Sequence, residues 1–321
     1  MNGNNKKVFV MMSGGVDSSV AALLLKKQEY DVVGVFMRCF NLDGCAERDA
    51  EDARRVAEKL DIPFYVWDFE KEYKKKVVEY MVEGYKQGIT PNPDVMCNKE
   101  IKFGLFLEKA LAMGADYVAS GHYARLSKRK NFIPSTRFGR SSDDLACPRR
   151  ATAGASLITA DQARSAAGVS ENKIFSLKIA KDKNKDQSYF LWTLTQKQLK
   201  HCLFPIGDYL KSEVREIARK AELPTAEKKD SQGICFLGKV TLDEFLKQYI
   251  PEKRGAVLNI SGEKLGEHNG AHFYTIGQRH IGIKYQSASR RTSIKDNADT
   301  KPYYVAEKDV KTNTLMMAEG N

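Results

Sequence analysis

Short apolar runs alternate with amphipathic stretches through the first 125 residues of the chain. Four runs have the length and composition of buried strands, at 7–12, 31–37, 63–67 and 117–120. Three stretches between them repeat their apolar positions with helical spacing, at 46–60, 73–85 and 102–113. This alternation predicts an α/β fold: a doubly wound parallel sheet with helices on both faces and ligands at the carboxyl ends of its strands. We therefore expect the residues that end three of these strands, at 13–18, 37 and 121–122, to converge on one crevice.

The alternation stops after residue 125. Residues 125–150 hold eight basic and two acidic residues, with serine, proline and glycine among them. A stretch of this length without periodicity is functional or a surface excursion, so residues 126–172 are interpreted as a basic loop inserted in the first domain. We place that first domain at residues 1–228.

The remaining chain predicts a helix followed by short strands. An amphipathic helix is expected at 212–221, and Thr241 to Glu244 has the pattern of a capping box that opens a short helix before Pro251. Glycine-rich turns then separate short strands, expected at 256–260, 273–276 and 303–305. We predict a small β-rich central domain over 229–285 and a further β segment over 286–321.

A glycine-rich loop joins the first strand to the first helix, with the sequence Ser13-Gly14-Gly15-Val16-Asp17-Ser18. Glycine lets the backbone approach an anion closely, and the helix N-terminus that follows favours negative charge. The chain lacks the Gly-x-x-x-x-Gly-Lys-Ser/Thr pattern of ATPases that release the γ-phosphate. Ser-Gly-Gly-x-Asp-Ser instead resembles the PP-loop of enzymes that split ATP into AMP and pyrophosphate. An ordinary glycine turn before a core helix is the alternative, and we interpret the loop as an ATP site.

Composition limits the partners, the location and the metal or disulfide content that we expect. The chain has 52 basic and 41 acidic residues, a net charge of +11, which is compatible with a polyanionic partner but is weak support by itself. No apolar run approaches the ~20 residues of a membrane span, and the N-terminus lacks the pattern of a secretion signal, so we expect a cytoplasmic protein without membrane association. The five histidines have no metal-ligand spacing, and no Cys-x-x-Cys pair occurs. A structural disulfide framework is not expected from the six cysteines, Cys39, Cys45, Cys97, Cys147, Cys202 and Cys235.

Two cysteines lie in segments that suggest chemistry. The prolines of the segment at 91–99 predict a rigid loop, which presents Asp94 three residues before Cys97 and is followed by Lys99 and Lys102. A nearby ammonium favours the reactive thiolate, although a small buried core cysteine is an equal alternative. The segment at 230–238 predicts a turn at Gly233 just before Cys235, or a strand with a buried thiol.

Adenylation and two thiols together suggest sulfur transfer. Adenylation makes a carbonyl oxygen a good leaving group, and a sulfur nucleophile can then displace AMP. One thiol would carry a persulfide and the second would release it, which leaves a disulfide. Cys97 and Cys235 lie 138 positions apart, so this chemistry requires the fold to bring them together.

Six motifs in a fixed order extend this picture over nearly all of residues 6–310. After the glycine-rich loop come Pro-Asn-Pro-Asp-x-x-Cys-Asn-Lys-x-Ile-Lys-Phe at 91–103, Gly-His-Tyr-Ala at 121–124, Lys-Asp-Gln-Ser-Tyr-Phe-Leu at 185–191, Asp-Ser-x-Gly-Ile-Cys-Phe at 230–236 and Tyr-Thr-Ile-Gly-Gln-Arg at 274–279. The set resembles the bacterial tRNA 2-thiouridylase family, MnmA (TrmU). The resemblance implies 2-thiolation of the wobble uridine, position 34, in the tRNAs for Lys, Glu and Gln, with release of AMP and pyrophosphate.

The resemblance also implies roles for individual residues. ATP, with Mg²⁺, would be held by Met11, Met12, Ser13, Gly14, Gly15, Val16, Asp17, Ser18, Met37 and Gly121. Cys235 would carry a persulfide delivered by a sulfur-relay protein or a cysteine desulfurase. Cys97 would be the second catalytic thiol, and the two would form a transient disulfide. The target base would meet Asn92, Pro93 and Asp94, with Asp94 a candidate general acid or base, and tRNA would also contact His122, Lys185, Asp186 and Gln187.

Two of these assignments have alternative interpretations, and the chain departs from the family pattern in two places. His122 could make a structural hydrogen bond after a strand end, and residues 185–187 could be a solvated turn. The basic loop is longer than the family usually shows, and we expect it to supply phosphate contacts. Residues 286–321 are expected to begin a C-terminal β-barrel domain that is incomplete here. The other functional readings are an amide-forming PP-loop ligase or synthetase, and a tRNA-binding remnant without turnover.

Overall fold

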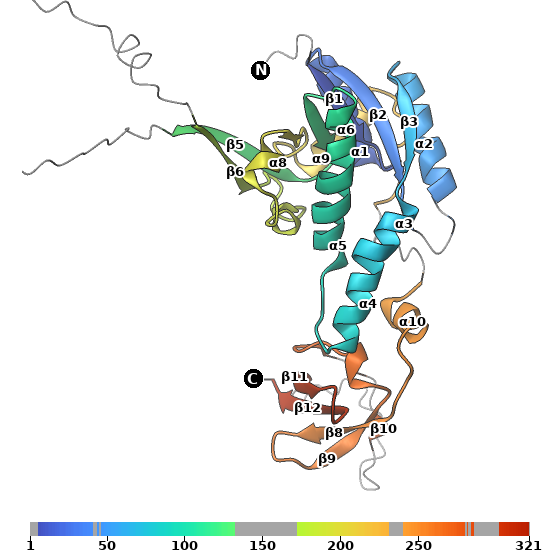
Figure 1. Cartoon of the computed structure of the whole chain (residues 1–321), viewed down its shortest axis with the longest axis vertical. Helices are drawn as coiled ribbons and strands as arrows, with labels where there is room; N and C mark the ends of the chain where they lie inside the picture. The colour runs from blue at the N-terminus through green and yellow to red at the C-terminus, as the bar shows by residue number, and fades with distance from the viewer. Residues whose placement is uncertain are drawn as a thin grey trace, which may run out of the picture.

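The computed structural model describes residues 6–40, 44, 46–131, 172–230, 240–279, 281, 284–285 and 302–320. Figure 1 shows an α/β body at one end of an elongated molecule and a β-rich module at the other, with α4 and α10 between them. A two-stranded hairpin projects sideways from the α/β body (Figure 1).

The α/β body contains a five-stranded parallel sheet in the order β3-β2-β1-β4-β7. The strands are β1 (Lys7–Met11), β2 (Asp31–Arg38), β3 (Phe64–Asp68), β4 (Tyr117–Ser120) and β7 (Cys202–Leu203). Successive strands run outward from β1 to β3, and the chain then returns to place β4 on the other side of β1. Ligands of doubly wound sheets bind at such a reversal, outside the carboxyl ends of the strands. The predicted α/β fold is confirmed.

Both faces of this sheet are buried, which explains why its strands are apolar throughout. Phe9 and Met11 of β1 belong to one hydrophobic cluster, whereas Val8 and Val10 belong to another on the opposite face. Helices α1 (Val16–Lys27), α2 (Ala46–Lys59) and α9 (Lys211–Lys220) contribute to the second cluster. The helices predicted at 46–60 and 212–221 are therefore confirmed within a residue at each end.

Two composite helices cover the other face. The first runs through α3 (Glu70–Tyr73), the π-helix η1 (Lys74–Val78) and α4 (Glu79–Lys86). The second runs through α5 (Pro93–Met96), the π-helix η2 (Cys97–Leu105) and α6 (Phe106–Ala112). Both helices begin before the stretches predicted at 73–85 and 102–113. The prediction rests on the spacing of apolar residues, which does not extend over the first turn of either helix.

The rigid loop predicted at 91–99 is wrong from Pro93 onward. Asn92 caps a helix there, its Oδ1 accepting hydrogen bonds from the backbone N–H groups of Asp94 at 3.0 Å and Val95 at 3.2 Å. Proline is favoured at the first helical position, where its missing N–H has no helical partner to lose. The prolines that suggested a loop therefore mark the start of a helix.

The predicted insertion at 126–172 also needs correction at its edges. β5 (Ala124–Asn131) pairs antiparallel with β6 (Asn172–Ile179) over eight residue pairs, so residues 126–131 and 172 are strand rather than loop. Residues 132–171 lie outside the described residues. After β6 the chain forms two short helices, η3 (Ser188–Phe190) and α8 (Gln196–Leu199).

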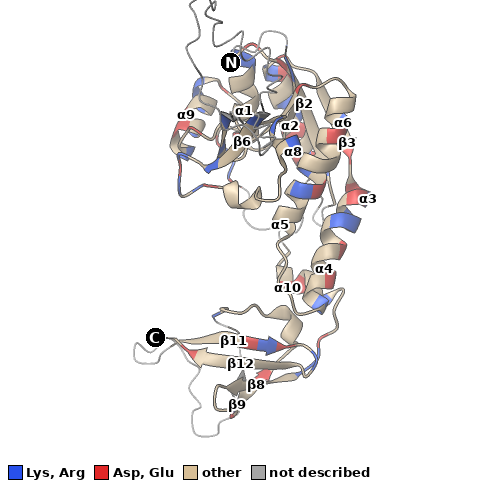
Figure 2. Ribbon diagram, turned by 60° about the vertical axis from the view of Figure 1, so that its left-hand side comes forward, with Lys and Arg blue, Asp and Glu red and all other residues tan. Residues whose placement is uncertain are grey.

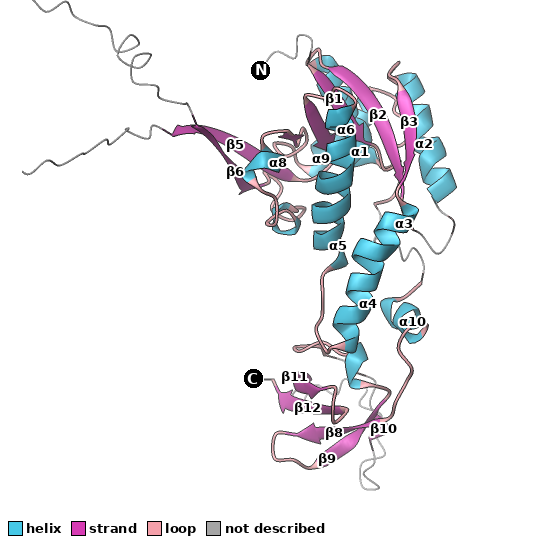
Figure 3. Cartoon of the chain, viewed as in Figure 1, coloured by secondary structure: helices cyan, strands magenta, loops and turns pink. Residues whose placement is uncertain are grey.

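The β-rich module is one sheet in the order β10-β9-β8-β12-β11 (Figure 3). Its strands are β8 (Gly255–Asn259), β9 (Lys264–His268), β10 (Lys284–Tyr285), β11 (Tyr303–Asp309) and β12 (Thr314–Glu319). β12 pairs with β8, so strands from the two segments predicted as 229–285 and 286–321 lie in one sheet. The strand predicted at 273–276 is wrong, because residues 271–273 form the 3₁₀-helix η4 (Ala271–Phe273) and no strand follows directly.

Helix α10 (Leu242–Lys247) joins the module to the α/β body. Its predicted capping box is confirmed: Thr241 Oγ1 accepts a bond from the Glu244 N–H at 3.3 Å, and Glu244 Oε2 accepts one from the Thr241 N–H at 2.9 Å. Phe245 and Leu246 are buried in the same cluster as the composite helices. The module itself contacts the end of α4, where the His272 ring lies 3.2 Å from the Tyr85 carbonyl oxygen.

Candidate functional site

The glycine-rich loop forms the turn between β1 and α1. Gly14 has φ +75°, and a Cβ there would collide with the backbone carbonyl of Asp49. Gly15 is the N-cap of α1 and no side chain caps this helix, so its first N–H groups lack the partner that a capping side chain provides. The Ser18 hydroxyl lies inside the loop, accepting from the Ser13 N–H at 3.1 Å and donating to the Gly15 carbonyl at 3.1 Å. This turn is preorganised for an anion at the helix N-terminus.

Gly121 brings the end of β4 against the same helix terminus. A Cβ on Gly121 would lie 2.6 Å from the Ser18 nitrogen and 2.8 Å from the Asp17 carbonyl carbon. Met11 pairs with Ser120 on one side and Val35 on the other, so the residues that follow β1, β4 and β2 leave the sheet at adjoining positions. Met37 lies two residues beyond Val35. The structure thus gathers the segments expected at the crevice.

His122 lies beneath this edge rather than on the surface. Its Nδ1 is 2.7 Å from Ser120 Oγ, and its ring centroid is 6.1 Å from that of Phe103 and 6.4 Å from that of Phe204. Burial, with a smaller contribution from the Lys102 charge, holds the pKa of His122 well below its usual value, so the imidazole is neutral. The described contacts of His122 are structural, and its contact with tRNA stays a prediction.

Residues 185–187 dock on the chain that follows β4. The Tyr123 N–H donates to Gln187 Oε1 at 3.0 Å, and the Gln187 N–H donates back to the Tyr123 carbonyl at 2.8 Å. Asp186 accepts bonds from the Ala180 N–H at 2.7 Å and the Ser188 hydroxyl at 2.8 Å. This segment is a hydrogen-bonded turn, from which the half-exposed Lys185 side chain reaches Asp230 at 3.1 Å.

A polar cluster lies beside the phosphate loop, consisting of Asp17, Tyr123, Lys211, Arg215 and Asp230. The Lys211 ammonium is 2.7 and 2.8 Å from the two carboxylate oxygens of Asp17 and 2.8 Å from Asp230 Oδ1. The Tyr123 hydroxyl donates to Asp17 Oδ1 at 2.9 Å, and Arg215 pairs with Asp230 at 2.8 Å.

The charges of this polar cluster are balanced by one another. Burial alone would raise the pKa of the Asp230 carboxyl, but the ammonium groups of Lys211 and Lys185 lower it to about 2. Burial and then the Asp17 carboxylate raise the pKa of Tyr123 far above its ordinary value, so its hydroxyl stays a donor. Sequence reasoning missed Lys211 and Arg215, because on an amphipathic helix they look like ordinary members of the polar face.

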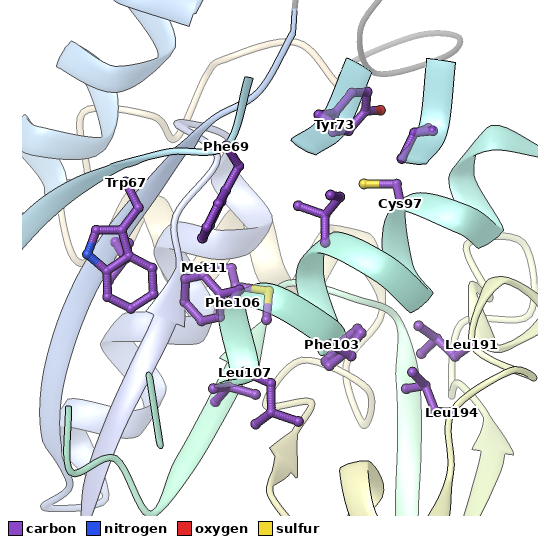
Figure 4. Packing of buried hydrophobic residues seen from close by; sticks show 14 of the residues in the cluster. Met11, Trp67, Phe69, Tyr73, Cys97, Phe103, Phe106, Leu107, Leu191 and Leu194 are labelled. Carbon is purple, nitrogen blue, oxygen red and sulfur yellow. The ribbon is translucent and has the colours of Figure 1, made fainter. Parts of the chain in front are cut away.

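Cys97 is 4% exposed and is the first residue of the π-helix η2. Figure 4 shows its side chain within the hydrophobic cluster that contains Tyr73, Phe103 and Leu191. Next to it Asn98 is also buried, its Nδ2 donating to the Asp94 carbonyl at 3.0 Å. Cys235 lies outside the described residues, and so does the predicted disulfide.

Two family models match the chain. The one described as the tRNA methyl transferase HUP domain matches residues 6–145 and 147–239, and the one described as the tRNA methyl transferase PRC-barrel domain matches residues 243–319. The curated protein "tRNA-specific 2-thiouridylase MnmA" of Streptococcus thermophilus is 44% identical over 329 residues, which cover 100% of this chain and 74% of that protein. Its counterpart from Listeria welshimeri is 44% identical over 327 residues, covering 99% and 73%. The chain belongs to the MnmA family.

MnmA family membership explains the architecture just described. The HUP match begins at β1 and includes the parallel sheet and the hairpin, and the PRC-barrel match begins within α10 and ends at β12. Membership also implies ATP use. The turn at Gly14, the close approach of Gly121 and the uncapped N-terminus of α1 fit a polyphosphate at this site.

Two further properties concern only the part of the chain that the structure describes. Within it, no three His, Cys, Asp or Glu residues are grouped so as to hold a metal ion. No helix there is long and apolar enough to cross a bilayer.

Proposed function

We propose that this MnmA family member is an ATP-dependent tRNA sulfurtransferase, which converts the wobble uridine of tRNAs for Lys, Glu and Gln to 2-thiouridine. The observation that carries the proposal is the phosphate loop. An uncapped helix N-terminus meets Gly14 and Gly121 at the reversal point of a doubly wound sheet. Curated relatives that share 44% of their residues with this chain are named tRNA-specific 2-thiouridylases.

Met11 to Ser18, Met37 and Gly121 would hold ATP, with Mg²⁺ on its phosphates. The C2 oxygen of uridine attacks the α-phosphorus, and pyrophosphate leaves. The terminal sulfur of a persulfide on Cys235 then attacks C2, and AMP departs with the former C2 oxygen. Attack of the Cys97 thiolate on the Cys235 sulfur frees the new 2-thiouridine and leaves a disulfide between the two cysteines. A persulfide-donating relay protein or a cysteine desulfurase would recharge Cys235 after the disulfide is reduced.

The surroundings of Cys97 support this assignment in two ways. π-helical turns are rare in proteins, and those that occur are often found at functional sites. The π-helix η2 begins at Cys97. The helix that leads into it is fixed at its start by the Asn92 cap, which places Asp94 one turn before the thiol. Asn92, Pro93 and Asp94 would meet the target base at this helix start, with Asp94 the general acid or base.

The assay is ATP-dependent formation of 2-thiouridine in unmodified tRNA, supplied with a persulfide donor and measured by nucleoside mass spectrometry. Cys97→Ser is expected to abolish the product while AMP formation continues. The matched control is Cys202→Ala. Cys202 is another buried thiol, whose pKa burial raises to about 12, and its Sγ lies 3.2 Å from the Gln198 carbonyl. Product from Cys97→Ser, or no product from the wild-type protein, would overturn the proposal.

A further inference from the structure

Four segments from separate sequence motifs meet at the polar cluster. Asp17 belongs to the phosphate loop, Tyr123 to the Gly-His-Tyr-Ala motif, and Asp230 to the motif that carries Cys235. The fourth segment, 185–187, joins at both ends: Gln187 exchanges two hydrogen bonds with Tyr123, and Lys185 pairs with Asp230. Together with Lys211 these contacts form a closed ring.

Lys211 is the member of the ring that no motif contains. Its side chain is 13% exposed, and its ammonium lies 2.8 Å or less from a carboxylate oxygen of both Asp17 and Asp230. Helix α9 holds it there, because Val214 and Ala218 of α9 are fully buried against α1. A second contact fixes the chain that leads to Asp230 to helix α1: Thr225 Oγ1 donates to Ser19 Oγ at 2.9 Å.

Geometry gives Lys211 a task beyond holding the fold. The Lys211 ammonium is shared between two carboxylates and links their positions, so a displacement of Asp17 shifts a donor that Asp230 also uses. Asp17 lies in the first turn of α1, where the phosphates of ATP would bring negative charge. Asp230 immediately precedes the segment that carries Cys235.

We propose that Lys211 is a positioning residue that couples occupancy of the ATP site to Asp230, the first residue of the motif 230–236. This inference rests on the proposed function, since it assumes that ATP binds the phosphate loop. Lys211 holds Asp17 in the orientation that the loop needs, and it holds Asp230 at a fixed distance from that loop. Arg215 and Lys185 balance the second carboxylate, so Asp230 can stay charged while Lys211 responds to the phosphates.

The test is hydrogen–deuterium exchange of the full chain with and without Mg·ATP, followed in peptides from 11–25 and from 211–230. In the wild-type protein ATP is expected to slow exchange in both. In Lys211→Met, ATP should slow exchange only in the peptides from 11–25. In Lys211→Arg, ATP should again slow exchange in the peptides from 211–230 as well. The control is Lys220→Met on the same helix, whose side chain is 74% exposed and pairs only with Glu216 among the described ion pairs, and it should behave as wild type.

Turnover provides a second readout. Lys211→Met is expected to lower the rate of tRNA-dependent AMP formation at saturating ATP by about tenfold or more, because small misplacements of reacting groups are costly. A purely structural lysine would change the melting temperature and leave the ATP response of the folded protein intact. Equal protection of 211–230 in Lys211→Met and wild type would overturn the coupling. If ATP protects only 11–25 in the wild-type protein, the coupling is overturned but the ATP site is supported. If ATP does not protect 11–25, the coupling and the proposed ATP site are both overturned.

Discussion

The His122 imidazole is buried against the rings of Phe103 and Phe204, and its Nδ1 contacts the Ser120 hydroxyl in place of water. Its neighbours explain why a histidine can be kept neutral there. Charging the ring would require solvation that this environment does not offer, and Lys102 adds an unfavourable positive charge. The sequence located His122 at a strand end but did not indicate its depth.

A neutral His122 has a measurable consequence for stability. The pKa of His122 is lowered in the folded state, whereas the unfolded chain takes up a proton near pH 6.5, so the free energy of unfolding falls as the pH drops below that value. The expected slope from this residue is roughly 1 kcal/mol per pH unit. Urea unfolding at pH 7.5 and 5.5 should show it in the wild type and not in His122→Gln. An NMR titration of the ring with a midpoint near 6.5 would contradict the assignment.

Residue chemistry was predictable where a motif required special backbone. Gly14 was expected from the glycine-rich loop and Gly121 from its place at a strand end and the family resemblance, and each lies where a Cβ would meet backbone atoms. Lys211 was not predictable, because its importance comes from two carboxylates that are distant in the chain. A single sequence does not reveal such a pairing for a lysine at the polar start of an amphipathic helix.

At the scale of elements, the sheet and its helices followed from apolar periodicity, whereas boundaries set by polar residues did not. The start of α5 depends on one side-chain cap at Asn92, and β9 contains Gly266 and three charged or polar residues, so neither has a strong apolar signature. Strand β5 was hidden because four of its eight residues are lysine or arginine, and without it the hairpin partner of β6 was missing.

The contact between β4 and α1 gives a prediction for element packing. Gly121→Ala should destabilise the protein by about 2 kcal/mol and weaken ATP binding, since the added Cβ meets backbone atoms of α1 that cannot shift independently. Gly262→Asn is the control: Gly262 has φ +84° with nothing within 4 Å of an added Cβ, and asparagine tolerates that conformation. Denaturant unfolding and nucleotide titration measure both. Wild-type ATP affinity in Gly121→Ala would show that the contact does not shape the site.

At the scale of the molecule, α4 and α10 lie between the α/β body and the β-rich module. Figure 2 shows both signs of charge on α9 and along α3 and α4, so the net charge of +11 does not by itself mark a nucleic-acid surface on these helices. The sequence predicted β structure after residue 255 but divided it at 285, because parallel pairing of β8 with β12 joins strands more than 50 residues apart. The domain limits proposed from the sequence, 1–228, 229–285 and 286–321, stay predictions.

If ATP activates the C2 oxygen of a tRNA uridine, that oxygen must leave with AMP, and an isotope label can follow it. Unmodified tRNA carrying ¹⁸O at C2 of the wobble uridine would be incubated with the protein, Mg·ATP and a persulfide donor, and the AMP analysed by mass spectrometry. Adenylation at C2 predicts one ¹⁸O atom in the phosphate of each AMP, in amounts equal to the 2-thiouridine formed. AMP without the label, alongside 2-thiouridine, would show that ATP does not activate the C2 oxygen.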